Sequence, residues 1–272
     1  MTIRYDYHLH SDFSGDCEIP SEFMIERALT LGLQGLCFTE HHDQDLPEQE
    51  LVFTLDFDAY VRKMSRLKSQ YADRIRICSG IEFGIMKHLP PVLQTLLEKY
   101  SFDFVIASLH FVDGKDPYYP EYFIERSERE CYEEFLKTEY ETLKCFPPQS
   151  YDTLGHMDFI VRYGPNQNRE YSYEAYADYI DPILRLLIEN GKCLEVNTGG
   201  FKYGLGEPNP CAGVLRRYRE LGGELLTIGS DAHDPKHLCF DFDRVQALLL
   251  DLGFRYYAIF QERKLEMLPL NG

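Results

Sequence analysis

Short apolar runs alternate with longer amphipathic segments along most of the chain. Seven short runs predict strands, at 3–9, 33–39, 75–83, 102–110, 152–159, 192–197 and 224–231. Between them lie segments of helical length, including 21–32, 57–71, 128–146 and 173–191. In the last of these, Tyr176, Ile180, Leu184 and Leu187 recur at spacings of three and four, which is typical of one buried helix face.

Strands that alternate with helices predict a parallel α/β architecture. The periodicity alone leaves two forms open, a closed barrel and an open doubly wound sheet. The length of 272 residues suits a single α/β barrel, and no fixed repeat or flexible linker divides the chain. We therefore expect one domain over residues 1–272. Two long irregular segments, 111–127 and 197–211, are expected to form loops over a site.

The acidic composition argues against some classes of binding partner. A net charge of −17 without a basic cluster argues against nucleic acid, whose phosphates bind clustered Lys and Arg. No apolar run approaches the roughly 18 residues of a membrane span, and the start of the chain lacks the pattern of a secretory signal. We expect a cytoplasmic protein that binds neither nucleic acid nor membranes, and the sequence makes no prediction of its oligomeric state.

Histidines and acidic residues gather where the predicted strands end. At or just after the end of a run lie His8, His10, His41, Glu82, His110, Asp231 and His233, and His156 lies within the fifth run. Asp12 and Asp16 follow the first run and are equally eligible. Because the carboxyl ends of parallel strands share one face, we expect these side chains to converge. Imidazole nitrogens suit Zn, Fe or Mn, and carboxylates can bridge two ions. The mixture therefore predicts a multinuclear hydrolytic metal site.

The ordered motifs that carry these residues resemble a known family. HLHSDFSGD, FTEHH, GIEFG, SLH, GHMD and GSDAH resemble the PHP (polymerase and histidinol phosphatase) superfamily. EVNTGGFKYGLGEPNP, followed by GSDAH, is similar to its monofunctional histidinol-phosphate phosphatases. The resemblance spans roughly residues 3–235. It implies a distorted (β/α)7 TIM-like barrel, with three divalent metal ions (Zn, Fe or Mn) at the carboxyl ends of its strands.

The resemblance also implies which residues hold each ion. One ion would bind His8, His10, Glu82 and Asp231. A second would share Glu82 as a bridge and add His110 and His156. The third would bind Asp16, His41 and His233. Some relatives have a histidine at the position of Asp16, so the metal at the third position stays open.

The implied activity is hydrolysis of L-histidinol phosphate to L-histidinol and phosphate, a step of histidine biosynthesis. A metal-bridging hydroxide would attack phosphorus directly, with Glu82 bridging two ions and Asp231 taking a proton. His42 is expected to protonate the leaving alkoxide or to help place the phosphate, and the alternative is a hydrogen bond that supports the ligands. Arg162 and Lys202 are expected to bind the phosphate, although relatives often carry Arg near the position of Lys202.

Two alternatives remain at this point. The first is a PHP-family phosphoesterase that acts on another small phosphorylated metabolite, or on nucleotides or oligonucleotides. The acidic charge and the length-matched resemblance to the histidinol enzymes disfavour the nucleotide substrates. The second is a non-enzymatic module with a relic metal site, which the complete set of expected ligands disfavours. Tyr118 and Tyr119, in the 111–127 loop, are expected to border the pocket of the leaving group.

Overall fold

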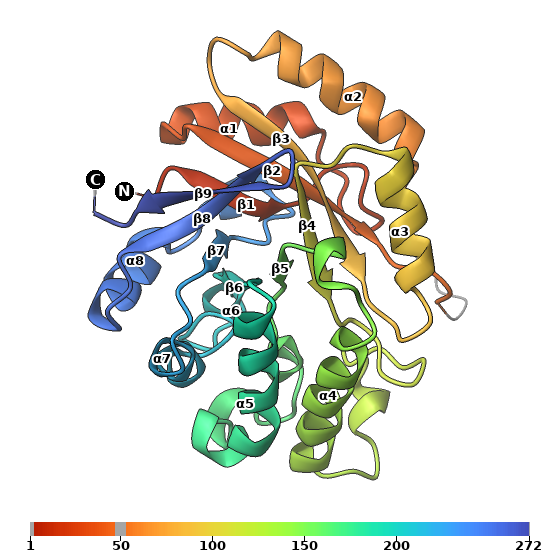
Figure 1. The fold of residues 1–272 in the computed structure, drawn as a ribbon, viewed down its shortest axis with the longest axis vertical. Helices are drawn as coiled ribbons and strands as arrows, with labels where there is room; N and C mark the ends of the chain where they lie inside the picture. Colours follow the sequence, from red (N-terminus) through yellow and green to blue (C-terminus); the bar gives the residue numbers. More distant parts are fainter. Residues whose placement is uncertain (1–2, 47–52, 272) are drawn as a thin grey trace.

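Seven parallel strands form one sheet whose order in space follows the chain (Figure 1). The computed structural model describes residues 3–46 and 53–271. The strands are β1 (Tyr5–Leu9), β2 (Gly35–His42), β3 (Arg76–Gly84), β4 (Phe104–Ser108), β5 (Thr153–Leu154), β6 (Cys193–Asn197) and β7 (Leu226–Gly229). Leu9 pairs with Ala232 just beyond β7, so the first and last strands meet. The predicted distorted (β/α)7 barrel is confirmed.

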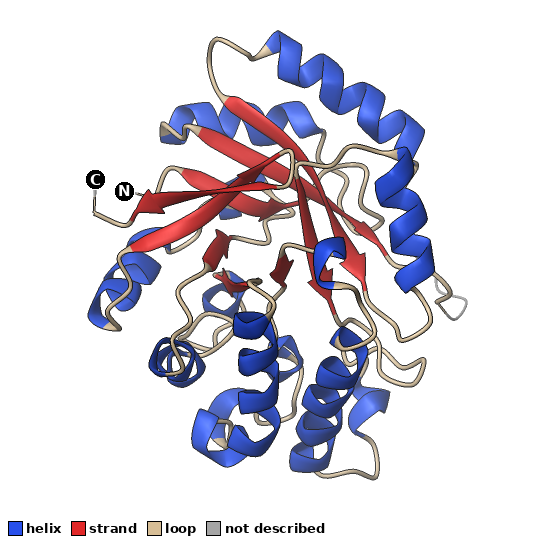
Figure 2. Cartoon of the chain, in the orientation of Figure 1, coloured by secondary structure: helices blue, strands red, loops and turns tan. Residues whose placement is uncertain are grey.

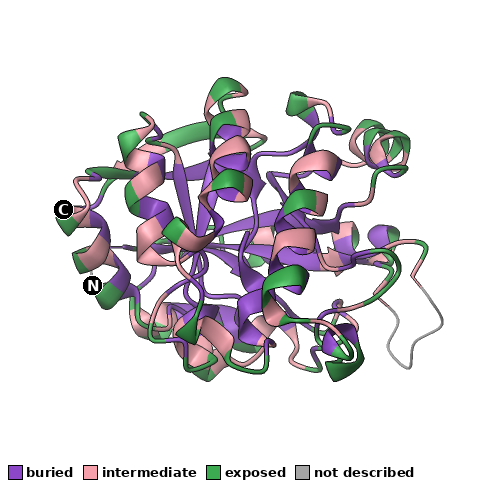
Figure 3. Ribbon diagram, turned by 90° about the horizontal axis from the view of Figure 1, so that it is seen from below, coloured by how far each residue is buried: buried purple, intermediate pink, exposed green. Residues whose placement is uncertain are grey.

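Helices surround the barrel (Figure 2). They are α1 (Ser21–Leu31), α2 (Phe57–Gln70), α3 (Pro90–Lys99), α4 (Glu128–Leu143), α5 (Tyr173–Glu189), α6 (Gly199–Lys202), α7 (Ala212–Glu220) and α8 (Phe242–Asp251). Burial is greatest along the strands and the inward helix faces, while the outward faces are exposed (Figure 3). No helix in the described part of the chain is both long and apolar enough to cross a membrane.

Local sequence signals explain where several helices begin and end. Asp56 accepts a hydrogen bond from the backbone N–H of Ala59 at the start of α2. Ser127 and Glu130 form a capping box at the start of α4. Gly32 follows α1 with a φ of 72°, a conformation that glycine adopts without a steric penalty. These signals explain the ends of α1, α2 and α4, which the sequence predicted.

The amino end of the barrel is covered by an antiparallel hairpin that was not predicted, β8 (Tyr256–Gln261) and β9 (Lys264–Pro269). The hydroxyl of Tyr7 donates to the carbonyl of Phe260 at 2.6 Å. The turn residues Glu262 and Arg263 have φ values of 51° and 61°. Such turns usually contain Asn or Gly, so the sequence carried no turn signal here.

One predicted strand is much shorter than expected. Of the range 152–159, only Thr153 and Leu154 form a strand. A Cβ atom at Gly155 would lie 2.3 Å from the Ser108 Oγ atom, so the chain passes close to β4 and then leaves the sheet. His156 consequently lies beyond the strand. Helices α3, α7 and α8 were also not predicted. The single domain over 1–272 stays a prediction, and 1–2, 47–52 and 272 lie outside the described residues.

Candidate metal centre

A bulge in β1 turns two consecutive side chains toward the barrel interior. Asp6 pairs with Leu36, and the next pair is Leu9 with Phe38. Strand β1 therefore advances by three residues where β2 advances by two. The Tyr7 hydroxyl lies 3.6 Å from the Cys78 sulfur, and His8 Nε2 lies 3.2 Å from Glu82 Oε2. Cys78 and Glu82 share one face of β3 because they are four residues apart. Tyr7 therefore fills the interior, while His8 and His10 enter the cluster at the strand ends.

Glu82 is fully buried and lies at the centre of the predicted ligands. Its Oε2 atom lies 3.2, 3.5 and 3.0 Å from ring nitrogens of His8, His10 and His41. Its Oε1 atom lies 3.3 and 2.9 Å from the Nε2 atoms of His110 and His156. Each carboxylate oxygen thus faces its own group of histidines, which is the geometry that a carboxylate needs to bridge two ions.

Asp231 enters the cluster from the end of β7. Its backbone has a φ of 53°, a conformation that is uncommon for residues other than glycine. Its N–H donates to the carbonyl of His8 at 2.7 Å. Its Oδ1 atom lies 3.5 Å from His10 Nε2 and 3.7 Å from His233 Nδ1. Asp231 therefore faces histidines from both sides of the seam between β1 and β7.

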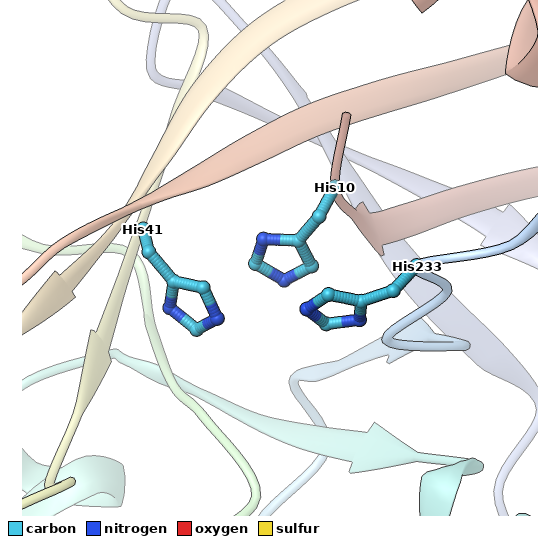
Figure 4. Close-up of side chains that lie close together, drawn as sticks. All are labelled: His10, His41 and His233. Carbon is cyan, nitrogen blue, oxygen red and sulfur yellow. The ribbon is translucent and has the colours of Figure 1, made fainter. Parts of the chain in front are cut away.

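Asp16, His41 and His233 meet at the more open side of the cluster. The Oδ2 atom of Asp16 lies 3.2 Å from His233 Nε2 and 3.6 Å from His41 Nε2. The rings of His41 and His233 each stack on His10, with centroids 4.2 Å apart (Figure 4). The structure thus brings the three predicted ligand groups into one continuous cluster, in which His10 belongs to two neighbouring groups.

Buried polar atoms in this cluster lack hydrogen-bond partners among the described residues. They are Nε2 of His8, Nε2 of His10, Nδ1 of His41, Nδ1 of His156, Nε2 of His233 and Oε2 of Glu82. Burial of an unpaired polar atom is costly, so native proteins rarely leave several together. Four overlapping triads of histidine and acidic side chains here could each hold a metal ion. The donor set fits divalent ions of the Zn, Fe or Mn type.

Both buried carboxylates of the cluster are held in the ionised form. Burial would raise the pKa of Glu82, but the neighbouring His8 and His41 hold that pKa well below its usual range. Burial would likewise raise the pKa of Asp231, and His8 and Arg162 hold it well below its usual range. Negative charge on these two carboxylates, among imidazole rings, favours the binding of cations.

Two acidic residues that were not predicted contact the Nδ1 atoms of the histidine rings, on the side away from Glu82. Glu195 Oε1 lies 2.5 Å from His8 Nδ1, and its Oε2 atom accepts a hydrogen bond from the backbone of His156. Asp43 Oδ1 lies 2.8 Å from His110 Nδ1. These contacts orient the Nε2 atoms of His8 and His110 toward Glu82. Asp43 carries the same sequence signal as the ligands, an acidic residue just after a strand, whereas Glu195 lies in the middle of β6.

Arg162 and Lys202 both lie beside Asp231. The buried Arg162 donates from Nη1 to Asp231 Oδ2 at 3.1 Å, from Nε to Asn209 at 2.7 Å and from Nη2 to Asn197 at 2.9 Å. Lys202 Nζ donates to the backbone carbonyl of Asp231 at 3.1 Å. The structure therefore brings the two cations that were predicted to bind phosphate to one side of the cluster.

His42 does not join the cluster, so the geometry does not support its predicted role as a proton donor. Consecutive residues of a strand point to opposite faces, so His42 points away from the side that His41 faces. Its ring packs against Phe57 and Phe83, with centroids 4.8 and 5.8 Å away. Its Nδ1 atom accepts a hydrogen bond from the backbone of Leu55. His42 is thus a packing residue between the barrel and its outer layer.

Comparison with known proteins gives matches over nearly the whole chain. A family model described as the PHP domain matches residues 6–199. A histidinol-phosphatase of Lactococcus lactis subsp. lactis is 30% identical, over 97% of this chain and 96% of the relative. A probable histidinol-phosphatase of Clostridium acetobutylicum is 31% identical, over 96% of this chain and 98% of the relative.

A solved structure agrees with these sequence matches. The crystal structure of histidinol phosphate phosphatase from Lactococcus lactis, complexed with zinc, L-histidinol and phosphate, superposes with a TM-score of 0.89. It is 29% identical, and the match covers 97% of this chain and 99% of that one. The resemblance inferred from the motifs is confirmed, and this chain belongs to the PHP domain family.

Proposed function

We propose that this protein is a metal-dependent phosphomonoesterase that hydrolyses L-histidinol phosphate to L-histidinol and phosphate. The observation that carries the proposal is the setting of Glu82, whose two oxygens face separate groups of histidine nitrogens. The substrate is proposed because the full-length relative from Lactococcus lactis is a histidinol-phosphatase, and its structure holds zinc, L-histidinol and phosphate.

We infer three divalent ions per chain. His8, His10, Glu82 and Asp231 would hold the first. Glu82, His110 and His156 would hold the second, and Asp16, His41 and His233 the third. The short distances within each group support this assignment. When bound, such ions lower the pKa of a shared water and neutralise the negative charge of the phosphate.

Arg162 is suited to bind the phosphate. Of the five N–H donors of a guanidinium group, three are committed to Asn209, Asn197 and Asp231. One N–H on each terminal nitrogen is left for two phosphate oxygens, and the three fixed bonds orient the group before substrate arrives. Lys202 would add a second positive charge on the same side.

Asp231 is suited to accept a proton during the attack on phosphorus. Its Oδ2 atom is occupied by the guanidinium of Arg162, which helps to fix the carboxylate. Its Oδ1 atom faces His10 and His233 instead. That oxygen can receive the proton of an attacking water within the cluster.

The substrate is tested with purified, zinc-loaded protein. We expect kcat/KM for L-histidinol phosphate to exceed that for p-nitrophenyl phosphate and nucleoside monophosphates by at least roughly 100-fold, the discrimination available to a site that contacts the alcohol. Equal rates on all esters would overturn the substrate and keep the phosphatase class. Preference for nucleotides would favour the alternative phosphoesterase.

The metal content is tested by elemental analysis of the same protein. Three ions per chain are expected. One ion or none, together with no hydrolysis of any monoester, would favour a non-enzymatic binding module instead.

A further inference from the structure

The GHMD motif contains a carboxylate that the proposed metal site does not use. Asp158 follows His156 by two residues and is 1% exposed. Its Oδ1 atom accepts a hydrogen bond from Asn209 Nδ2 at 2.6 Å. Its Oδ2 atom accepts one from the backbone N–H of Cys211 at 3.0 Å. Both carboxylate oxygens thus bind the segment 209–211, which follows the last turn of the long 197–211 segment.

Asn209 joins Asp158 to the guanidinium of Arg162. The buried amide of Asn209 donates from Nδ2 to Asp158, and its Oδ1 atom accepts from Arg162 Nε at 2.7 Å. An ionised carboxylate can only accept hydrogen bonds, and a guanidinium can only donate them. The amide therefore satisfies both neighbours in one orientation only, and Asp158 holds the oxygen of Asn209 toward Arg162.

A second asparagine holds another side of the same guanidinium. Asn197 Oδ1 accepts a hydrogen bond from Arg162 Nη2 at 2.9 Å. Its Nδ2 atom donates to Glu195 Oε2 at 3.2 Å and to Asp231 Oδ2 at 3.4 Å. The backbones of Asn197 and Asn209 also pair, with both N–H to carbonyl distances at 2.8 Å. Two paired asparagines, each oriented by carboxylates, thus hold Arg162.

Close packing leaves the Arg162 guanidinium little freedom to turn. Its central carbon lies 4.9 Å from the centroid of the Tyr203 ring, and a Cβ atom at Gly199 would lie 2.9 Å from Nη2. Ordering a long side chain costs rotamer entropy. Here that entropy is lost when the protein folds, so the binding of a phosphate does not have to order the side chain again.

We propose that Asp158 is a positioning residue for phosphate binding, and that it acts on Arg162 through Asn209. The amide orients the guanidinium and also separates it from the Asp158 carboxylate, so the positive charge stays available to a phosphate. This inference rests on the proposed phosphate-binding role of Arg162 and deepens it. It extends the phosphate site to a carboxylate outside the proposed metal ligands.

The inference is tested by calorimetric titration of zinc-loaded protein with inorganic phosphate, which requires no turnover. We expect Arg162→Met to weaken phosphate binding about 10- to 100-fold, the effect of losing charged hydrogen bonds. Asp158→Ala removes both acceptors and frees Asn209 to turn, so we expect binding about 5- to 10-fold weaker than in the wild-type protein. The zinc content should be unchanged in both variants.

A second variant, Asp158→Asn, keeps the volume of the side chain and one acceptor oxygen. It should weaken phosphate binding in the same direction, by at least about threefold, because one oxygen cannot serve both the Asn209 amide and the Cys211 N–H. If Asp158→Ala does not fold, Asp158→Asn alone decides the outcome.

The route through Arg162 is tested by combining the changes. In Arg162→Met protein, Asp158→Asn should change phosphate affinity by less than about twofold, because the group that Asp158 positions is absent. A role in fold stability alone would instead lower the affinity by the same factor in both backgrounds.

Asp103→Asn is the matched control for loss of a buried carboxylate. Asp103 is 7% exposed and lies at the amino end of the barrel, where it accepts a hydrogen bond from the backbone N–H of Ser79 at 2.8 Å. This variant should be less stable than the wild-type protein and should bind phosphate with unchanged affinity. Weaker phosphate binding in Asp103→Asn would show that lost stability alone explains the Asp158 variants, and would overturn the inference.

Failure of this inference and failure of the proposed function give different results. A wild-type protein that releases no phosphate from L-histidinol phosphate overturns the proposed function, whereas the titration still decides the role of Asp158. Unchanged affinity in Arg162→Met overturns the phosphate-binding role of Arg162 and the inference with it. Weaker binding in Arg162→Met, with unchanged affinity in Asp158→Asn, overturns the positioning role alone.

Discussion

Buried carboxylates at the amino end of the barrel and Glu82 at its carboxyl end differ in how their oxygens are paired. At the amino end, Asp103 precedes β4 and accepts hydrogen bonds from Lys68 at 2.6 Å and from the backbone of Ser79 at 2.8 Å. Asp152 precedes β5 and accepts from the backbone of Val105 at 2.9 Å. At the carboxyl end, Glu82 Oε2 is buried without a hydrogen-bond donor among the described residues.

This difference distinguishes acidic residues that stabilise the fold from acidic residues that can bind a metal ion. A carboxylate whose oxygens accept from backbone N–H groups is satisfied by the fold itself. A carboxylate that faces imidazole nitrogens with free lone pairs is satisfied only by protons or by cations. Burial alone would not have distinguished Asp103 from Glu82, whereas the identity of their partners does.

The largest effect is expected from Glu82→Ala. Because Glu82 is proposed to bridge two ions, its loss should remove both and lower kcat by at least roughly 1,000-fold, on the scale of losing an essential electrostatic group. Elemental analysis and steady-state kinetics measure the two effects. A variant that keeps all of its ions would contradict the bridging role.

A smaller effect is expected from Glu195→Gln. This change weakens the contact with His8 Nδ1 and leaves the proposed ligands intact. Residues that orient metal ligands usually contribute about 10- to 100-fold to metal affinity or activity. Competition with a chelator measures the affinity. If affinity is unchanged while only thermal stability falls, Glu195 belongs with the structural acids of the amino end.

Asp103→Asn should affect stability and leave the metal centre unchanged. We expect the free energy of unfolding to fall by about 1–3 kcal/mol, because a charged hydrogen-bond acceptor is lost. Burial would raise the pKa of Asp103, and Lys68 and the Ser79 N–H lower it below its usual value. The stabilisation is therefore complete above about pH 4, the pKa of an unfolded Asp, and is lost as the pH falls through the lower pKa of the folded state.

Denaturant unfolding at several pH values measures this prediction. The difference between wild-type and Asp103→Asn proteins should be constant at neutral pH and should shrink only in acid. A loss of bound ions in Asp103→Asn would contradict the separation of the two ends.

The smallest effect on catalysis is expected from His42→Asn. Loss of a general acid typically costs about 100- to 10,000-fold, whereas a packing residue outside the cluster should change kcat/KM by less than about threefold. Asn keeps an oxygen that can accept the hydrogen bond from Leu55. A fall of about 100-fold or more in a folded, metal-loaded variant would restore His42 as a catalytic residue.

Much of the fold was predictable because parallel strands and crossover helices leave regular patterns in the sequence. The hairpin at the amino end was not, since its turn is made by Glu262 and Arg263 rather than by Asn or Gly. The strand around Thr153 was overestimated because an apolar composition does not reveal where backbone pairing stops. Gly155 and its close approach to Ser108 decide that point.

The convergence of the proposed ligands was also predictable, because strand ends share one face. Two details required the structure. The bulge in β1 lets Tyr7 and His8 both face inward, which simple alternation would forbid. The supporting acids Glu195 and Asp43 were missed because the motifs directed attention to histidines. Because side chains alternate along β2, the sequence already indicates that His41 and His42 face opposite sides of the sheet.

The seam that closes the barrel runs through the metal centre. The N–H of Asp231 donates to the carbonyl of His8, and the N–H of His10 donates to that of Ala232. Roughly 220 residues separate the two sides of this seam, and the chain entropy lost on joining them rises with the logarithm of that length. Ions shared by both sides would act as a reversible cross-link between the first and last strands. The concentration of available metal ions would then affect the stability of the closed barrel.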